Sequence, residues 1–299
     1  MISRSLIWAL LVLSSVLVGC AQQTPSQPLP ASVQQAHRWS QLAEEAQDEG
    51  RLSLAVSYWQ RAQEAYQQSD HWRGQLQARA ARIELALRLG ADTEAASLLA
   101  AQERHLAWLQ ASPEALEQEL QVFRLQKDYL AALNARQQGD LPTARQYTAR
   151  LLAQSLPPSL FLAVGVLSIE LAQADQDPDW AEALVELQHW LAQAEISPRL
   201  RDHYAYRLQR FEAAQQMSQA PEAAQAQLYA VAEFYRTQGA WSALAATLTD
   251  LGDHYQQQGH LDQAVFYWQR AYTLRLAQGE QWAMRALEQR LDLSSVARY

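Results

Sequence analysis

The sequence predicts an all-α solenoid of about six antiparallel helix pairs, followed by one C-terminal capping helix. From Ala31 onward the chain is rich in Ala, Leu, Gln, Glu and Arg, which favour helices. No segment alternates β-branched and polar residues as a strand does. The turns within the predicted pairs fall near residues 50, 90, 139, 176, 219 and 259. Their mean spacing of about 42 residues indicates an internal repeat.

In the first half of the array, glycines mark the helix ends. Three glycines stand where C-terminal turns are expected, namely Gly50, Gly90 and Gly139. Ser112 precedes Pro113, as a capping side chain precedes proline at the first helical position. The pair 157–158 is Pro-Pro and ends a further helix. The helices predicted here cover residues 32–48, 53–68, 72–89, 92–108, 113–138 and 141–154.

The second half combines caps and glycine turns. Asp177-Pro178 and Ser197-Pro198 are cap and first-turn pairs, and Gly239 and Gly259 end helices. The predicted helices cover residues 159–174, 178–194, 198–217, 221–237, 241–257 and 262–277. A last helix, 280–295, has Trp282, Met284, Leu287 and Leu291 on one side, and we expect it to cap the stack.

The first twenty residues read as an export signal. Arg4 is followed by an apolar run, residues 6–18, that is shorter than the roughly 20 residues needed to cross a hydrocarbon core. Such a run before small residues is typical of a signal peptide, which would cover residues 1–19. An ordinary secretory signal and an uncleaved anchor are the alternatives.

Leu17-Val18-Gly19-Cys20 resembles the lipobox of bacterial lipoproteins, which implies that Cys20 is lipidated after cleavage. Cys20 is the only cysteine, so no internal disulfide is possible and acylation removes an odd exported thiol. In that family Asp after the cysteine favours retention in the inner membrane. Ala21 stands there, so the resemblance implies an outer-membrane anchor with the protein facing the periplasm.

Beyond the anchor, three parts follow. Residues 20–30 are a Pro-, Gln- and Ser-rich flexible tether, 31–279 the helical repeat domain, and 280–299 the capping helix and C-terminal tail. The formal net charge is −8 and no basic stripe stands out, which disfavours nucleic acid binding.

Two segments resemble tetratricopeptide (TPR) repeats, with small residues where paired helices touch and large ones between them. Residues 39–62 place Ala55, Trp59 and Ala62 after Gly50, and residues 248–271 place Ala264, Trp268 and Ala271 after Gly259. The match weakens in the middle, where residues 159–217 keep only the helix rhythm. The resemblance implies a right-handed superhelix whose concave groove is lined by the first helix of each pair.

The resemblance also places six candidate partner-binding residues in that groove: His37, Ser40, Glu44, Thr249, Asp253 and Gln256. TPR domains that grip a peptide carboxylate have Lys and Asn where Ser40 and Glu44 stand, so a carboxylate clamp is not expected. An acidic, polar groove suits a basic or extended protein segment.

Motifs for catalysis and cofactors are missing. No two of the seven histidines have the i, i+4 spacing of a helical metal site, so we expect no metal site. No phosphate loop, dinucleotide fingerprint or nucleophile elbow is present, so no cofactor, no small-molecule substrate and no catalytic residue is expected.

The sequence therefore predicts a non-enzymatic, lipid-anchored scaffold or adaptor in cell-envelope biogenesis, with a peptidoglycan synthase as one possible partner to regulate. A pilotin or an assembly factor for a secretin or outer-membrane complex is the alternative. A peptidoglycan hydrolase would need two carboxylates about 5–10 Å apart in a cleft. Small-ligand sensing would need an enclosed pocket inside the superhelix.

Overall fold

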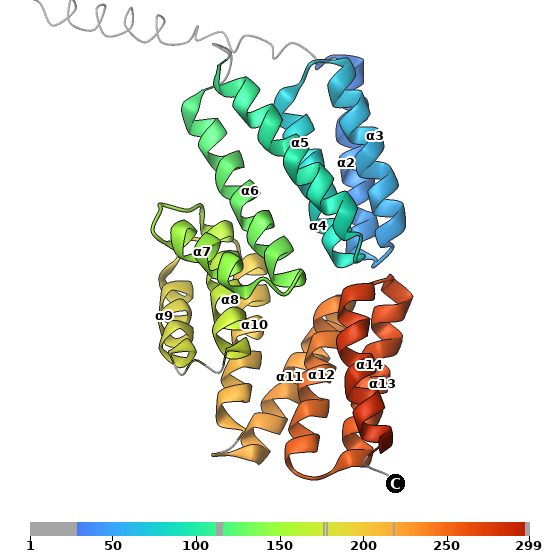
Figure 1. Ribbon diagram of the computed structural model, residues 1–299, viewed down its shortest axis with the longest axis vertical. Coiled ribbons are helices and arrows are strands. Elements are labelled where there is room, and N and C mark those ends of the chain that lie inside the picture. Colours follow the sequence, from blue (N-terminus) through green and yellow to red (C-terminus); the bar gives the residue numbers. More distant parts are fainter. Residues whose placement is uncertain (1–28, 112–115, 176, 178, 218, 297–299) are drawn as a thin grey trace, which may run out of the picture.

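The protein is all-α. The computed structural model describes residues 29–111, 116–175, 177, 179–217 and 219–296, and within them it has thirteen α-helices and no strand (Figure 1). The first helices are α2 (Ala31–Asp48), α3 (Leu52–Gln68), α4 (Trp72–Arg88), α5 (Asp92–Gln110), α6 (Glu117–Gln137) and α7 (Leu141–Leu152). The others are α8 (Pro158–Ala174), α9 (Trp180–Gln193), α10 (Pro198–Gln216), α11 (Pro221–Gln238), α12 (Trp241–Gln257), α13 (Leu261–Gln278) and α14 (Gln281–Val296).

Local signals predicted most helix ends to within two residues. Ser197 caps α10, because its Oγ accepts a hydrogen bond from the backbone N–H of Leu200 at 3.3 Å. Asp177 does not cap α9. Its Oδ1 accepts from the N–H of Asp179, and the helix starts at Trp180 rather than at the predicted 178. The predicted cap at Ser112 lies outside the described residues.

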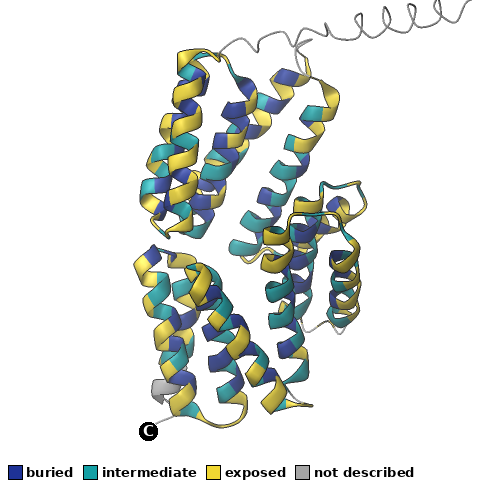
Figure 2. Cartoon of the chain, turned by 180° about the vertical axis from the view of Figure 1, so that it is seen from behind, coloured by how far each residue is buried: buried dark blue, intermediate teal, exposed yellow. Residues whose placement is uncertain are grey.

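The helices pack in succession, each against the next along the chain. Alternate helices also touch, in the pairs α4 and α6, α6 and α8, α8 and α10, and α10 and α12. This succession of packed helices is consistent with the predicted solenoid. It arises because a single amphipathic helix cannot bury its apolar side alone, and Figure 2 shows buried residues along the sides that face neighbouring helices.

The last helices of the array lie next to the first ones. Figure 1 shows α11 to α14 lying below α2 to α5, with α7 to α10 on the other side of the molecule. The last helix, α14, packs against α13 and also against α4. The last helix therefore connects the end of the array to the early helix α4.

Two glycine turns lie at this closure. Gly50 and Gly90 have φ of 75° and 71°, which only glycine adopts readily. A Cβ at Gly50 would lie 3.2 Å from Cγ of Gln278, and a Cβ at Gly90 would lie 3.3 Å from Cβ of Gln281. Glycine at these turns thus ends a helix and also lets α13 and α14 approach.

The two segments with the repeat pattern have their tryptophans in the core. Trp59 and Trp268 are 3% and 0% exposed, whereas Trp39, at the start of the first segment, is only partly buried. Each buried indole Nε1 donates a hydrogen bond, Trp59 to Oε1 of Gln47 at 2.7 Å and Trp268 to Oδ1 of Asp253 at 2.9 Å. A buried indole N–H needs such a partner.

No helix in the described part of the chain combines the length and the apolar character needed to cross a membrane. Cys20 and the other residues of the predicted signal lie outside the described residues.

Candidate functional site

A cavity of about 610 Å³ lies between the helices of the array. Its lining residues come from α2, α4, α6, α8, α10, α12 and α14, the alternate helices of the array, and from the C-terminal ends of α11 and α13. The volume lies within the range of about 300–1,000 Å³ that is typical of small-molecule sites.

The wall of this cavity combines charged side chains with apolar ones such as Leu87, Leu133 and Leu167. Five of them are arginines: Arg88, Arg136, Arg207, Arg210 and Arg275. Four are carboxylates: Asp48, Glu84, Glu170 and Glu280. Asp48 and Glu84 are exposed, whereas Glu170 and Glu280 are drawn into ion pairs within the fold.

We call the first of these groups the Glu170 triad: Glu170 of α8, Arg136 of α6 and Arg207 of α10. Oε1 of Glu170 accepts from Nη2 of Arg207 at 3.0 Å, and its Oε2 accepts from Nη1 of Arg136. Burial would raise the pKa of Glu170, but the two guanidiniums lower it to about 2. The carboxyl is therefore ionised at neutral pH and links three helices that are not consecutive.

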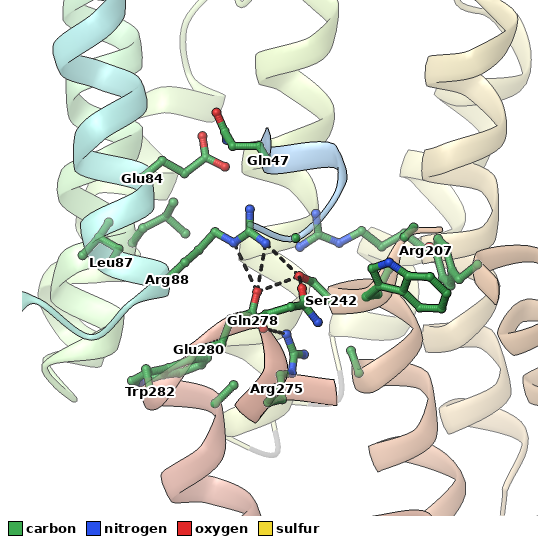
Figure 3. Close-up of a pocket in the computed structure, with 18 of the residues that line it drawn as sticks. Gln47, Glu84, Leu87, Arg88, Arg207, Ser242, Arg275, Gln278, Glu280 and Trp282 are labelled. Carbon is green, nitrogen blue, oxygen red and sulfur yellow. Dashed lines mark hydrogen bonds and ion pairs between the residues drawn. The ribbon is translucent and has the colours of Figure 1, made fainter. Parts of the chain in front are cut away.

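We call the second group the Glu280 junction: Arg88, Ser242, Arg275, Gln278 and Glu280 (Figure 3). Oε1 of Glu280 accepts from Nη2 of Arg88 at 2.9 Å and lies 2.6 Å from the hydroxyl of Ser242. Arg275 bonds to Oε2 of the same carboxylate. The Glu280 side chain is 4% exposed, so this junction is a nearly buried ion network that joins α4 to the end of the array.

Burial opposes ionisation of Glu280, but Arg275, Ser242 and Arg88 together lower the pKa of its carboxyl. A second contact supports the same closure, because the Arg136 guanidinium lies 5.1 Å from the ring centre of Trp282 on α14. Such a cation–π contact is worth about 0.5–2 kcal/mol.

Near the cavity wall, Tyr235 has a hydroxyl with no hydrogen-bond partner. The residue is 1% exposed, and its Oη is buried and unpaired. Burial raises the pKa of this hydroxyl although Arg210 and Arg207 act against the rise, so the group stays protonated and able to donate. His203 packs edge-on against Tyr235, with ring centres 6.4 Å apart. Burial and the nearby Arg207 and Arg199 lower the pKa of His203, which leaves its imidazole neutral at pH 7.

The three predicted groove residues on α2 lie together on one helix. His37 and Glu44 are exposed, and Ser40 is partly exposed. The His37 ring packs edge-on against Tyr66 at 5.8 Å. The Ser40 hydroxyl donates to the backbone carbonyl of Ala36 at 3.1 Å, so that part of its bonding capacity is used within α2.

The other three predicted groove residues belong to α12, a helix that lies below α2 in Figure 1. Gln256 is exposed and Thr249 is partly exposed. Asp253 has a structural role, because its carboxylate accepts hydrogen bonds from Trp268 and from Arg290 of α14. The bonds from Arg290 are 2.8 Å long at Nε and 3.0 Å long at Nη2. None of the six residues lines the central cavity.

The arginines of the cavity were missed at the level of sequence. Read singly, each is an ordinary charged residue on an amphipathic helix. The only hint of these arginines in the sequence is the composition, because nearly all basic residues of the chain are arginines and Lys127 is the single lysine. Arginine is preferred where a carboxylate or phosphate is held by several parallel hydrogen bonds.

Within the described residues, no group of three or more His, Cys, Asp or Glu side chains is arranged to hold a metal ion. A scan against protein-family models and a search of curated proteins each found no match.

Proposed function

We propose that the protein is a lipid-anchored, non-catalytic scaffold of the bacterial cell envelope that binds another protein of the periplasm. The observation that carries this proposal is the succession of packed helices, which gives an extended surface of the kind that helical-repeat proteins use for binding. The lipobox-like tetrapeptide ending at Cys20 supplies the expected anchor, and Ala21 favours the outer membrane.

The finer fold assignment is part of the same proposal. We infer a TPR-like right-handed superhelix of six helix pairs with α14 as the final helix. The buried Trp59 and Trp268 and the fully buried Ala55 and Ala264 support it, because they occupy the positions that the repeat pattern gives them.

The two ion-paired carboxylates of the cavity, Glu170 and Glu280, are unsuited to the acid role in glycoside hydrolysis. A hydrolase needs one carboxyl that stays protonated as a general acid, which requires a raised pKa. The pKa values of Glu170 and Glu280 are both lowered by the arginines around them. Neither can donate a proton near neutral pH.

The partner surface is best sought on α2 and α12. His37 and Glu44 on α2 and Gln256 on α12 are exposed, whereas Asp253 is held by the fold. A photo-crosslinking amino acid at position 37 or 256 in the native host should give a defined adduct. The same amino acid at Glu103 on α5, whose side chain is 72% exposed, is the matched control.

The identity of the captured partner decides among the scaffold roles. A peptidoglycan synthase would support regulation of cell-wall synthesis. A secretin or an outer-membrane assembly factor would support the pilotin or assembly role instead. Equal adducts from positions 37, 256 and 103 would contradict a specific surface. Degradation of cell-wall material by the purified protein would contradict the non-catalytic role.

The anchor is tested separately. Cys20→Ala should move the protein from the outer-membrane fraction to the soluble or unprocessed fraction, because no thiol remains to carry the lipid. Ala21→Asp, the matched control, should keep the lipid but shift the protein to the inner membrane. Density-gradient fractionation measures both. Unchanged fractionation of Cys20→Ala would contradict the lipoprotein assignment.

A further inference from the structure

We propose that the central cavity is a binding site for a small polyanion, a molecule that carries two or more carboxylate or phosphate groups. The inference goes beyond the scaffold role and does not depend on it. It rests on the cavity of about 610 Å³, on the five guanidiniums in its wall, and on one buried hydroxyl that has no partner.

The two buried carboxylates of the wall, Glu170 and Glu280, already have hydrogen-bond partners, whereas the other two, Asp48 and Glu84, are exposed. Each of the two carboxylate oxygens of Glu170 accepts from a different arginine. Both oxygens of Glu280 are likewise engaged, one by Arg88 and the other by Arg275. A ligand that brought only donors or a positive charge would find no free acceptor on these two residues.

Hydrogen-bond donors, in contrast, remain available. A guanidinium has five N–H groups, and Arg136, Arg207 and Arg210 each use a single nitrogen in their ion pairs. The side chains of Arg136 and Arg207 stay 24% and 29% exposed, and both line the cavity. Their remaining N–H groups require acceptor atoms, which an oxyanion supplies in bidentate geometry.

The Tyr235 hydroxyl is an independent indication. Buried hydroxyl groups are rarely left without a partner, because the loss of hydration is then uncompensated. Tyr235 lines the cavity together with Arg207 and Arg210, and both guanidiniums act on the pKa of its hydroxyl, so the three groups share one part of the wall. A bound acceptor oxygen would satisfy the one cavity-lining group that the fold leaves unsatisfied.

Charge favours more than one anionic group on the ligand. The Glu170 triad has two guanidiniums for one carboxylate, and the Glu280 junction has the same ratio. Each group therefore has one positive charge in excess, and the two groups stand at different places on the wall. This excess is local, because Asp48 and Glu84 bring the wall as a whole to five arginines and four carboxylates. A ligand with two or more oxyanions matches both.

Isothermal titration calorimetry of the purified full-length protein in detergent tests the proposal, with citrate and pyrophosphate as probes at low ionic strength. We expect saturable binding of at least one probe. Arg207→Gln and Tyr235→Phe should each weaken it about tenfold or more, because each removes a hydrogen bond to a charged ligand. Arg236→Gln, in an exposed pair with Glu233 on α11, should bind like the wild type.

Tyr235→Phe separates binding from folding. Its hydroxyl has no partner, so the variant should unfold at the same temperature as the wild type or a higher one. Weaker binding without loss of stability would support the site. The absence of saturable binding of both probes at millimolar concentration would overturn the proposal, as would wild-type affinity in both variants. Neither result bears on partner capture, which tests the scaffold role separately.

Discussion

At the scale of single residues, Gly252 shows how closely the last helices pack. A Cβ at this position of α12 would lie 2.4 Å from Cδ1 and Nε1 of Trp268, closer than any real Cβ contact. Trp268 is fully buried and its Nε1 bonds to Asp253, so the indole has no free direction in which to move. Only a residue without a side chain fits against this ring.

Gly252→Ala should therefore destabilise the protein. Alanine gains roughly 1 kcal/mol over glycine inside a helix. Overpacking typically costs about 1–3 kcal/mol, and the hydrogen bond from Trp268 to Asp253 is disturbed as well. We expect a net loss of about 1–2 kcal/mol in the free energy of unfolding, measured by urea denaturation.

The matched control is Gly165→Ala in α8, where a Cβ would lie 3.0 Å from the two terminal methyl groups of Leu187 and 3.6 Å from its Cγ. These methyls can shift at little cost. We expect this variant to change stability by less than about 1 kcal/mol. An equal loss in the two variants would contradict the role given to Trp268.

At the scale of elements, Glu170 joins helices that are not neighbours along the chain. Its carboxylate on α8 binds arginines on α6 and α10. The folded-state pKa, lowered to about 2, lies below the ordinary value of 4.5. The stabilisation from the ionised carboxylate is thus fully present above about pH 5, and it is lost as pH falls from about 4.5 toward 2.

Glu170→Gln should remove this part of the acid sensitivity. We expect the urea midpoint of the variant to fall less steeply than that of the wild type between pH 5 and pH 3. Glu119→Gln is the control, because Glu119 forms an exposed pair with Arg73, and such pairs contribute little. If Glu170→Gln and Glu119→Gln follow the same pH profile, Glu170 does not carry the effect.

The elements themselves were predictable because their ends are encoded locally. Gly239 and Gly259, for example, have positive φ and follow α11 and α12 where the sequence placed the turns. The cavity was not predictable, because its wall depends on contacts between distant segments. Arg88 and Glu280 are 192 residues apart in sequence, and no local pattern pairs them.

Ser40 and Asp253 were assigned to the groove from their positions in the repeat pattern. Those positions do not predict the hydrogen bonds that Ser40 makes to Ala36 and Asp253 makes to Trp268.

At the scale of the whole molecule, the Glu280 junction determines whether the array is closed. Glu280→Ala leaves Arg88 and Arg275 without their carboxylate. Removing one partner of a buried ion pair costs about 3–5 kcal/mol. We expect faster hydrogen exchange at the C-terminal end of α4 and in α14, and a larger radius of gyration by small-angle X-ray scattering.

Glu233→Gln is the control for this variant, because the exposed ion pair of Glu233 with Arg236 lies within α11 and joins no two helices. It should leave both measurements unchanged. Wild-type exchange in α4 and α14 of the Glu280→Ala variant would show that the apolar contacts alone keep the array closed.

The contact between α4 and α14 also bears on how such a chain can evolve. Open helical arrays contact only their neighbours, so duplication or loss of a repeat changes their length at little cost. Here the loss of one pair, for example α10 and α11, would move α14 away from α4 and separate Arg88 from Glu280. The contact between α4 and α14 therefore constrains the number of helices, and descendants of this chain are expected to vary by substitution at constant length.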